Sequence, residues 1–185
     1  CIRDRFNAVL KWMAAYPDMR NLGKLAIVTN AGYETVGGVD TLGDFDSDRL
    51  YSLTEKDEAA LTDILRRHDM GGLIAAANPL DLTPMADESV YLDCVETMIG
   101  FGADSVLLGL VPLSEQLHTD EIAQAETFAA RLKSLVSATG CFVGIVIDAG
   151  VPYQQYKAVF ERQGFPVFDG MDMGILGFNV LKNSR

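Results

Sequence analysis

The chain has 185 residues, of which 49% are apolar, and carries a formal net charge of −11. Such a charge argues against nucleic acid and anionic membrane surfaces as partners, because both are held by clustered Lys and Arg. No run of about eighteen apolar residues is free of charges and breaks, so no membrane-spanning segment is predicted. At this length we expect one domain over residues 1–185. We expect this domain to be excised from a longer multidomain chain, because the sequence opens on Cys1 without an initiator Met.

The cysteines indicate a reducing compartment and hence a cytoplasmic protein. Cys1, Cys94 and Cys141 are odd in number and far apart, which fits neither a disulfide framework nor a CxxC metal site. We expect Cys94 and Cys141 to be small buried hydrophobic residues.

Apolar runs and amphipathic stretches alternate along the chain. A helix is predicted over residues 3–15. The predicted strands then follow at 25–29, weakly at 50–53, and at 73–77, 105–111, 142–147 and 166–168. Helix start signals lie at Thr54, at Asp87 with Glu88, and at 119–121, and a last helix covers about 171–182. This alternation is typical of an α/β fold with a parallel sheet covered on both faces.

Ligands of such sheets bind beyond the carboxyl ends of the strands, where the strand order reverses. The segments that follow the strands are residues 30–38, 78–85, 112–118 and 148–152. The acidic residues at 43–48 are interpreted as a surface loop, and the acidic pair Asp120 and Glu121 as a solvated face.

The first of these segments, NAGYETVGG, lacks both the GxGxxG dinucleotide fingerprint and the P-loop motif. Asn30, Ala31 and Gly32 could still form a small anion-binding nest of backbone N–H groups at the start of a helix. Glu34 would complement the helix dipole and so compete with a bound phosphate. An ordinary strand-to-helix turn is the alternative reading.

The segment NPLDLTPMAD, residues 78–87, is the most unusual stretch of the sequence. Its prolines favour an extended conformation at the residues before them, Asn78 and Thr83, and so predict a stiff loop. Asn78, Asp81 and Thr83 could position a ligand, or merely satisfy the backbone of their own loop. Asp148, at the end of the run at 142–147, is a further candidate at the ligand edge, although a turn residue is the commoner explanation there.

The two histidines give weaker signals. His68 ends a predicted helix and is interpreted as a capping or surface residue. His118 precedes the helix at 119–121 and could face the ligand edge, but no Cys or second His stands near it in the sequence to indicate a metal site or an activated nucleophile.

Four segments together resemble one family. They are KLAIVTNAG at 24–32, NPLDLTPMAD at 78–87, GADSVLLGLVP at 102–112 and GFPVFDGMDMGILGFNVL at 164–181. In order and spacing they are similar to the C-terminal flavodoxin-like domain of NDP-forming acyl-CoA synthetases, relatives of succinyl-CoA synthetase. The resemblance implies a three-layer, flavodoxin-like, mostly parallel sheet with helices on both faces.

The resemblance also implies an activity for the parent enzyme. An ADP-forming acyl-CoA synthetase, or acid–thiol ligase, reversibly converts an acid, CoA and ATP into acyl-CoA, ADP and phosphate. A phosphohistidine carries the phosphoryl group, and CoA, ATP or ADP and Mg are bound by other domains or subunits, including an ATP-grasp domain. This domain is then expected to bind no cofactor itself and to be inactive in isolation. Whether it forms a homo-oligomer is not decided by the sequence.

By this resemblance, the domain presents a helix N-terminus to the phosphohistidine. The residues at that helix start are Asn30, Ala31, Gly32, Tyr33 and Glu34, continuing to 35. The family pattern reads Asn-Ala-Gly-Gly-Pro-Gly, and this chain departs from it with Tyr33 and Glu34. Either Glu34 points away from the phosphate, or this copy has lost the phosphoryl step. In the second case a regulatory, ligand-sensing or structural role, as in synthetase-like regions fused to protein acetyltransferases, becomes the alternative. A flavin-binding role is supported by fold analogy alone.

Overall fold

The computed structural model describes residues 2–17, 23–43, 49–112 and 114–183, with the side chains described as far as residue 181. Its centre is a five-stranded, all-parallel sheet in the order β2-β1-β3-β4-β5. The strands are β1 (Leu25–Thr29), β2 (Leu80–Asp81), β3 (Ser105–Gly109), β4 (Phe142–Val146) and β5 (Val167–Phe168). The expected parallel α/β sheet is therefore confirmed, and its strand order is that of flavodoxin-like folds.

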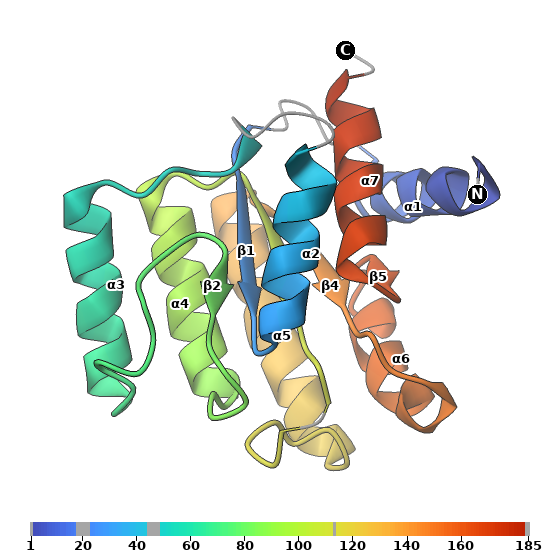
Figure 1. Ribbon diagram of the computed structural model, residues 1–185. Helices are drawn as coiled ribbons and strands as arrows, with labels where there is room; N and C mark the ends of the chain where they lie inside the picture. The colour runs from blue at the N-terminus through green and yellow to red at the C-terminus, as the bar shows by residue number, and fades with distance from the viewer. Residues whose placement is uncertain (1, 18–22, 44–48, 113, 184–185) are drawn as a thin grey trace.

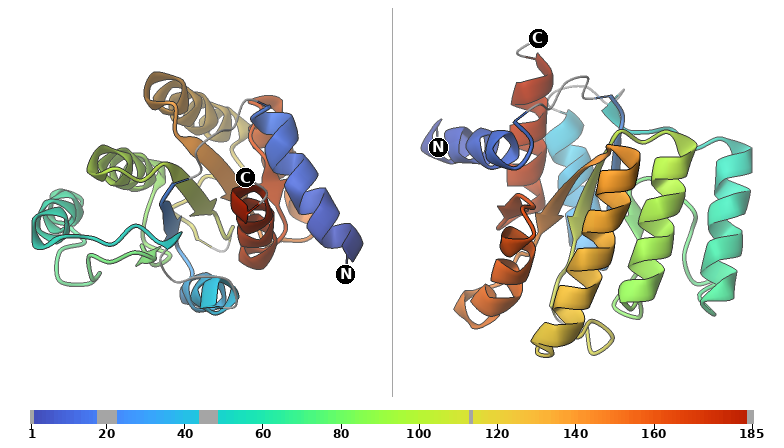
Figure 2. Two further views of the ribbon diagram at one scale, coloured as in Figure 1. Left: turned by 90° about the horizontal axis from the view of Figure 1, so that it is seen from above. Right: turned by 180° about the vertical axis from the view of Figure 1, so that it is seen from behind.

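Helices cover both faces of the sheet (Figure 1). One face carries α1 (Ile2–Ala15), α2 (Gly32–Gly43) and α7 (Met171–Asn183). The other carries α3 (Glu55–Arg67), α4 (Glu88–Phe101), α5 (Ile122–Thr139) and α6 (Gln154–Arg162), the last preceded by the short 3₁₀ helix η2 (Val151–Tyr153). The view from behind in Figure 2 shows α3 to α6 side by side, and the view from above shows α2 and α7 on the opposite side. The three-layer prediction is confirmed.

Alternate residues of the central strands supply the two cores. On β1, Ala26 and Val28 face the larger cluster under α3 to α6, whereas Leu25 and Ile27 face the cluster under α1, α2 and α7. Burial on both faces explains why these strands appear in the sequence as continuous apolar runs. Cys94 and Cys141 are buried and unpaired within the larger cluster, as expected.

The helix starts follow the predicted signals. Thr54 and Asp57 form a reciprocal capping box at α3, and the Asp87 carboxylate accepts hydrogen bonds from the backbone of Ser89 and Val90 at α4. These side chains satisfy backbone N–H groups that the first helical turn leaves unpaired. The segment at 119–121 also leads into the longest helix, α5, although Glu121 caps it without a side-chain hydrogen bond.

Two predicted strands are wrong. The run at 50–53 makes only one isolated bridge, from Leu50 to Leu25, and the run at 73–77 is not a strand. The strand that pairs with β1 is β2, at Leu80–Asp81. Between these contacts the Asn78 side chain forms the hydrogen bonds that a neighbouring strand would otherwise form with β1. Its amide donates to the carbonyls of Leu25 and Tyr51, and its oxygen accepts the N–H of Ile27.

Most of the segment at 30–38, which follows the first strand, is helical, because α2 begins at Gly32. Thr83 also differs from expectation: its φ is 58°, although the following Pro84 favours an extended conformation. The Asp81 carboxylate accepts the Thr83 N–H at 2.9 Å and holds this turn. Of the acidic stretch at 43–48, residues 44–48 lie outside the described residues. Within the described part of the chain, no helix has the length and apolar character needed to cross a bilayer.

Candidate functional site

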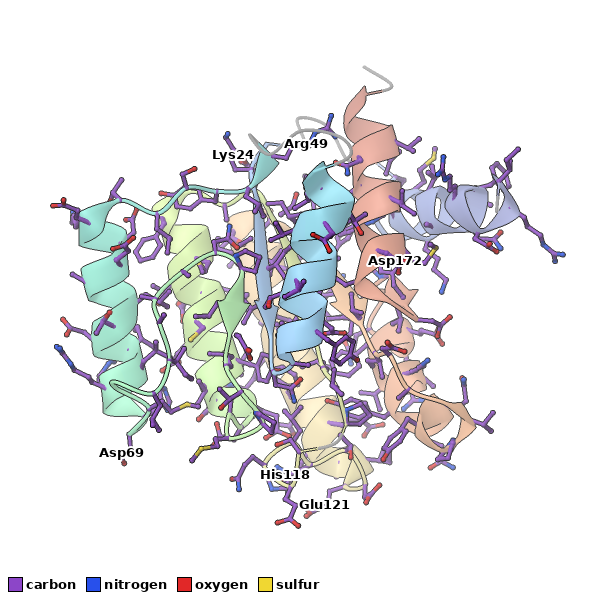
Figure 3. All side chains as sticks on the ribbon, in the orientation of Figure 1. Lys24, Arg49, Asp69, His118, Glu121 and Asp172 are labelled. Carbon is purple, nitrogen blue, oxygen red and sulfur yellow. The ribbon has the colours of Figure 1, made fainter. Side chains whose placement is uncertain are left out.

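The site lies at the carboxyl ends of β1 and β3, where the strand order reverses. The chain enters β2 on one side of β1 and β3 on the other, which is the position where open α/β sheets bind ligands. In Figure 3 this edge is the lower one, marked by His118 and Glu121, whereas Lys24 and Arg49 mark the opposite edge.

Asn30 joins the two strands across this switch point. Its side-chain amide donates to the Val111 carbonyl, and its oxygen accepts the Val111 N–H, both at 3.0 Å. Asn30 is buried, and this pair of bonds occupies its amide. Asn30 therefore fixes the loops after β1 and β3 relative to each other, and any ligand would meet the backbone beside it.

The start of α2 borders a cleft of about 300 Å³. The cleft contains six of the predicted site residues, brought together from two loops. Its lining residues are Asn30, Ala31, Gly32, Tyr33, Asp81, Thr83, Pro84, Val111 and Ser114. The first N–H groups of a helix have no acceptor within the helix, and here they belong to the segment that forms one wall of the cleft.

Asp81 lies close to this helix start. A Cβ atom added to Gly32 would lie 3.0 Å from the Asp81 Oδ2 atom. Gly32 therefore leaves just enough room for the Asp81 carboxylate beside the backbone of α2. The bond from the Thr83 N–H gives Asp81 a structural role at the cleft wall.

Glu34 lies beneath the start of α2 and not in the cleft. Its side chain is 2% exposed, and its Oε2 accepts a short hydrogen bond from the Thr29 hydroxyl. Its Oε1 is buried without a hydrogen-bond partner. Gly109 on β3 leaves room for it, since a Cβ atom there would lie 2.1 Å from Glu34 Oε2.

This burial changes the charge of Glu34. Desolvation raises the pKa of the Glu34 carboxyl from 4.5 to about 7; the Thr29 bond opposes this shift, and the nearby Asp148 charge adds to it. Near neutral pH a substantial fraction of Glu34 is therefore uncharged. The repulsion that the sequence predicts between Glu34 and an anion is weakened accordingly.

Asp148 and Tyr33 meet at the outer side of the helix start. The Tyr33 hydroxyl lies 3.4 Å from Asp148 Oδ2. Desolvation, together with the charges of Glu34 and Asp148, raises the pKa of Tyr33 to about 12. Tyr33 is consequently a hydrogen-bond donor at neutral pH, and Asp148 is its acceptor.

Further residues named by the sequence also lie apart from the cleft. Asn78 uses its amide on the backbone beside β1, as described above, and does not line the cleft. His118 borders another hollow, of about 470 Å³. Its Nδ1 lies 3.0 Å from Glu88 Oε2. That hydrogen bond raises the pKa of His118, and Glu88 also accepts the His118 backbone N–H at 2.8 Å. His68 is the C-terminal cap of α3, as predicted, and contacts Asp93.

Sequence reasoning missed Thr29, Gly109, Val111 and Ser114. Of these, Gly109 had a readable signal, because a glycine inside an apolar strand marks a close approach. Among the described residues, no group of three His, Cys, Asp or Glu is arranged to hold a metal ion.

Comparison with known proteins shows similarity in structure. Neither a protein-family model nor a curated protein sequence matches the chain. Among solved structures, the chain is similar to PH0766 from Pyrococcus horikoshii, with a TM-score of 0.73 and 21% identity over 96% of this chain. It is also similar to the dinucleotide-forming acetyl-coenzyme A synthetase 1 of Candidatus Korarchaeum cryptofilum. The TM-score is 0.72 with the apo form, at 17% identity over 95% of this chain, and 0.72 with the complex with phosphate and ADP, at 18% over 98%.

These matches cover only part of the similar proteins. The chain spans 40% of the PH0766 chain and 37% of the Korarchaeum synthetase chain. At these identities the likeness shows the fold, and the chain is therefore a three-layer, flavodoxin-like α/β domain of the kind found within a larger acetyl-CoA synthetase chain.

Proposed function

We propose that this chain is a domain of an ADP-forming acyl-CoA synthetase and that it presents the start of α2 to a phosphohistidine supplied by another domain. The histidine, the CoA site and the ATP-grasp site with its Mg belong to the other domains of that enzyme. The acid–thiol ligase reaction then requires the assembled enzyme, and this domain alone has no activity.

The observation that carries the proposal is the position of Glu34. Its carboxylate is turned under α2 onto Thr29 and Gly109, so that Glu34 does not stand in front of the Gly32 and Tyr33 backbone at the cleft, and Asp81 is the charged residue among those that line it. Fixed N–H dipoles at a helix start stabilise the negative oxygens of a phosphoryl group without reorganising during its transfer. Glu34, which argued against this role in the sequence, is compatible with it in this position.

A regulatory, ligand-sensing role is the second candidate, and the surrounding charge favours it. The Asp81 carboxylate lies beside Gly32, and Asp148 accepts from Tyr33, while the described residues that line the cleft include no Lys, Arg or His. Like charges around the helix start weaken phosphate binding. The rest of the parent chain discriminates the two: a histidine loop and an ATP-grasp region favour the ligase, whereas an acetyltransferase domain favours regulation.

Titration with inorganic phosphate tests the proposal on this chain. Backbone amide NMR shifts at 31–35 are expected to follow phosphate concentration. Gly32→Pro removes one N–H donor at a position where helices accept proline, and is expected to weaken binding. Its Cβ atom also crowds Asp81, so Gly32→Ala, which adds the same Cβ atom and keeps the N–H, is the control and is expected to bind more tightly than Gly32→Pro. Asp148→Asn removes a negative charge and is expected to tighten it severalfold. If the folded chain shows no shift at 31–35, or if Gly32→Pro binds as tightly as the unmodified chain, the phosphate role is wrong.

A further inference from the structure

Two backbone N–H groups at the start of α2 remain for a ligand of the cleft. The Ala31 N–H donates to the Thr29 hydroxyl at 3.2 Å, and the Glu34 N–H donates to the Ala31 carbonyl at 3.0 Å. Between them, the N–H groups of Gly32 and Tyr33 meet no acceptor within the described residues. These two N–H groups belong to lining residues of the cleft, and an acceptor on a ligand would satisfy them.

Asp81 supplies a fixed acceptor beside these donors. It stands at the end of β2, where it pairs with Thr29 of β1. Its Oδ1 accepts the Thr83 N–H at 2.9 Å, and this bond holds the carboxylate in place. Its Oδ2 faces Gly32, since a Cβ atom there would lie 3.0 Å from it, and accepts no hydrogen bond from the described residues. Donors and an acceptor are therefore held side by side at one cleft.

The charge of Asp81 is not compensated at the cleft. The described lining residues include no Lys, Arg or His, and Ala31, Pro84 and Val111 make part of the wall apolar. A carboxylate in such surroundings is stabilised by a charge-assisted hydrogen bond and destabilised by a second negative charge. A bare oxyanion would therefore satisfy Gly32 and Tyr33 but would be repelled by Asp81.

A ligand that combines an oxyanion with a hydrogen-bond donor fits both sides of the cleft. Hydrogen phosphate keeps an O–H group at neutral pH, and a phosphohistidine has its ring N–H. Either can accept from the backbone of α2 and donate to Asp81 Oδ2. Sulfate resembles hydrogen phosphate in size and charge but has no proton, and so it leaves Asp81 without a donor.

We infer that Asp81 determines the specificity of the cleft by selecting phosphoryl ligands that carry a hydrogen-bond donor of their own. The inference rests on the proposed function, because it takes the start of α2 as the site that binds the phosphoryl oxygens. It adds a property that a helix start alone does not have, since backbone N–H groups bind any oxyanion of suitable size.

Binding of phosphate and of sulfate at about pH 8 tests this inference, because both are then dianions that differ by one proton. Amide shifts at 31–35 give the dissociation constants. The unmodified chain is expected to bind phosphate roughly tenfold more tightly than sulfate, or better. Asp81→Asn keeps an oxygen for the Thr83 N–H and places an amide donor at the cleft. This variant is expected to bind sulfate at least as tightly as phosphate.

Asp148→Asn is the matched control. It removes the same charge from the other side of the helix start, where Asp148 accepts from Tyr33 and does not line the cleft. It is expected to tighten the binding of both anions and to keep their ratio. Far-UV circular dichroism and thermal unfolding verify that each variant folds. Asp81→Ser, whose hydroxyl can accept the Thr83 N–H, replaces Asp81→Asn if the latter does not fold.

Two peptides distinguish the sources of the phosphoryl group. One contains a phosphonopyrazole analogue of phosphohistidine, whose ring keeps an N–H, and the other a phosphonotriazole analogue, whose ring has none. Tighter binding of the pyrazole peptide, lost in Asp81→Asn, supports the inference and identifies a phosphohistidine as the donor. Equal binding of the two peptides, with the preference for phosphate over sulfate intact, supports it with free hydrogen phosphate as the ligand.

Two results would overturn the inference and leave the proposed function standing. One is an unmodified chain that binds phosphate and sulfate equally at 31–35. The other is a preference for phosphate that Asp81→Asn and Asp81→Ser both keep. If the folded chain shows no shift at 31–35 with either anion, the proposed function fails, and the inference fails with it.

Discussion

The Thr29 hydroxyl donates to the buried Glu34 carboxylate across the turn between β1 and α2, over the space left by Gly109. This contact connects the sheet to the helix start that borders the cleft. It also leaves one Glu34 oxygen, Oε1, buried without a partner. Glu34 is therefore the residue whose charge state most directly couples folding to the site.

The raised pKa of Glu34 predicts a pH-dependent stability. Because the pKa rises on folding from 4.5 to about 7, the protonated form is favoured in the folded state. This contribution is fully present below about pH 4.5 and is lost as the pH rises through about 7, a difference of roughly 3 kcal/mol. Glu34→Gln keeps the size of the side chain and removes the titration.

Urea unfolding at pH 5.5 and pH 8.5 measures this effect. From pH 5.5 to pH 8.5 the free energy of unfolding is expected to fall more for the unmodified chain than for Glu34→Gln. At pH 8.5 the variant is then at least as stable as the unmodified chain. Because other groups titrate equally in both proteins, the difference between their two pH dependences reports the titration of Glu34. An identical pH dependence of the two proteins would mean that Glu34 is ionised in the folded state at both pH values.

Gly109→Ala is expected to destabilise the fold by about 2 kcal/mol, because the new methyl group overlaps Glu34 and Thr29 in a packed site. Gly37→Ala on α2 is the control: a Cβ there meets nothing within 4 Å, and alanine favours a helix by about 1 kcal/mol. Chemical denaturation gives both values. If both substitutions change stability equally, the close packing at Gly109 is contradicted.

Asn78→Asp is expected to destabilise the fold by about 3 kcal/mol while leaving phosphate binding intact in the folded fraction. The carboxylate has the same shape but cannot donate to the Leu25 and Tyr51 carbonyls, and so it places a half-buried charge against two acceptors. Denaturation and phosphate titration of the same sample separate the two effects. If the variant instead binds phosphate more weakly at unchanged stability, Asn78 contributes to ligand binding.

Trp12→Ala is expected to cost about 4 kcal/mol, since it removes a fully buried side chain and its bond to Gly174. Met13→Ala, one residue away on the exposed side, is expected to change the stability of the monomer by less than about 0.5 kcal/mol. The comparison is made by thermal unfolding. Equal losses would show that α1 is not anchored through Trp12.

Much of the architecture was readable in the sequence, because strands buried on both faces and capped helices leave strong local patterns. The run at 25–29 and the Thr54 capping box illustrate this. The edge of the sheet was not readable: whether 50–53, 73–77 or 80–81 pairs with β1 depends on Asn78, whose side chain bonds to residues distant in sequence.

The site was predictable in part for the same reason. The cleft joins the predicted residues Asn30 to Tyr33 with Asp81 and Thr83, since these follow neighbouring strands. The direction of Glu34 could not be predicted, because it depends on Thr29 below it and on the missing side chain at Gly109, a residue on another strand.

The most direct test of the proposed role uses a peptide that contains a stable phosphohistidine analogue, with the unphosphorylated peptide as control. If α2 presents its first N–H groups to a phosphohistidine, amide shifts at 31–35 will appear with the phosphorylated peptide and not with the unphosphorylated one. These shifts will be smaller in Gly32→Pro. If the folded chain responds equally to both peptides, or to neither, the start of α2 in this protein does not serve a phosphohistidine.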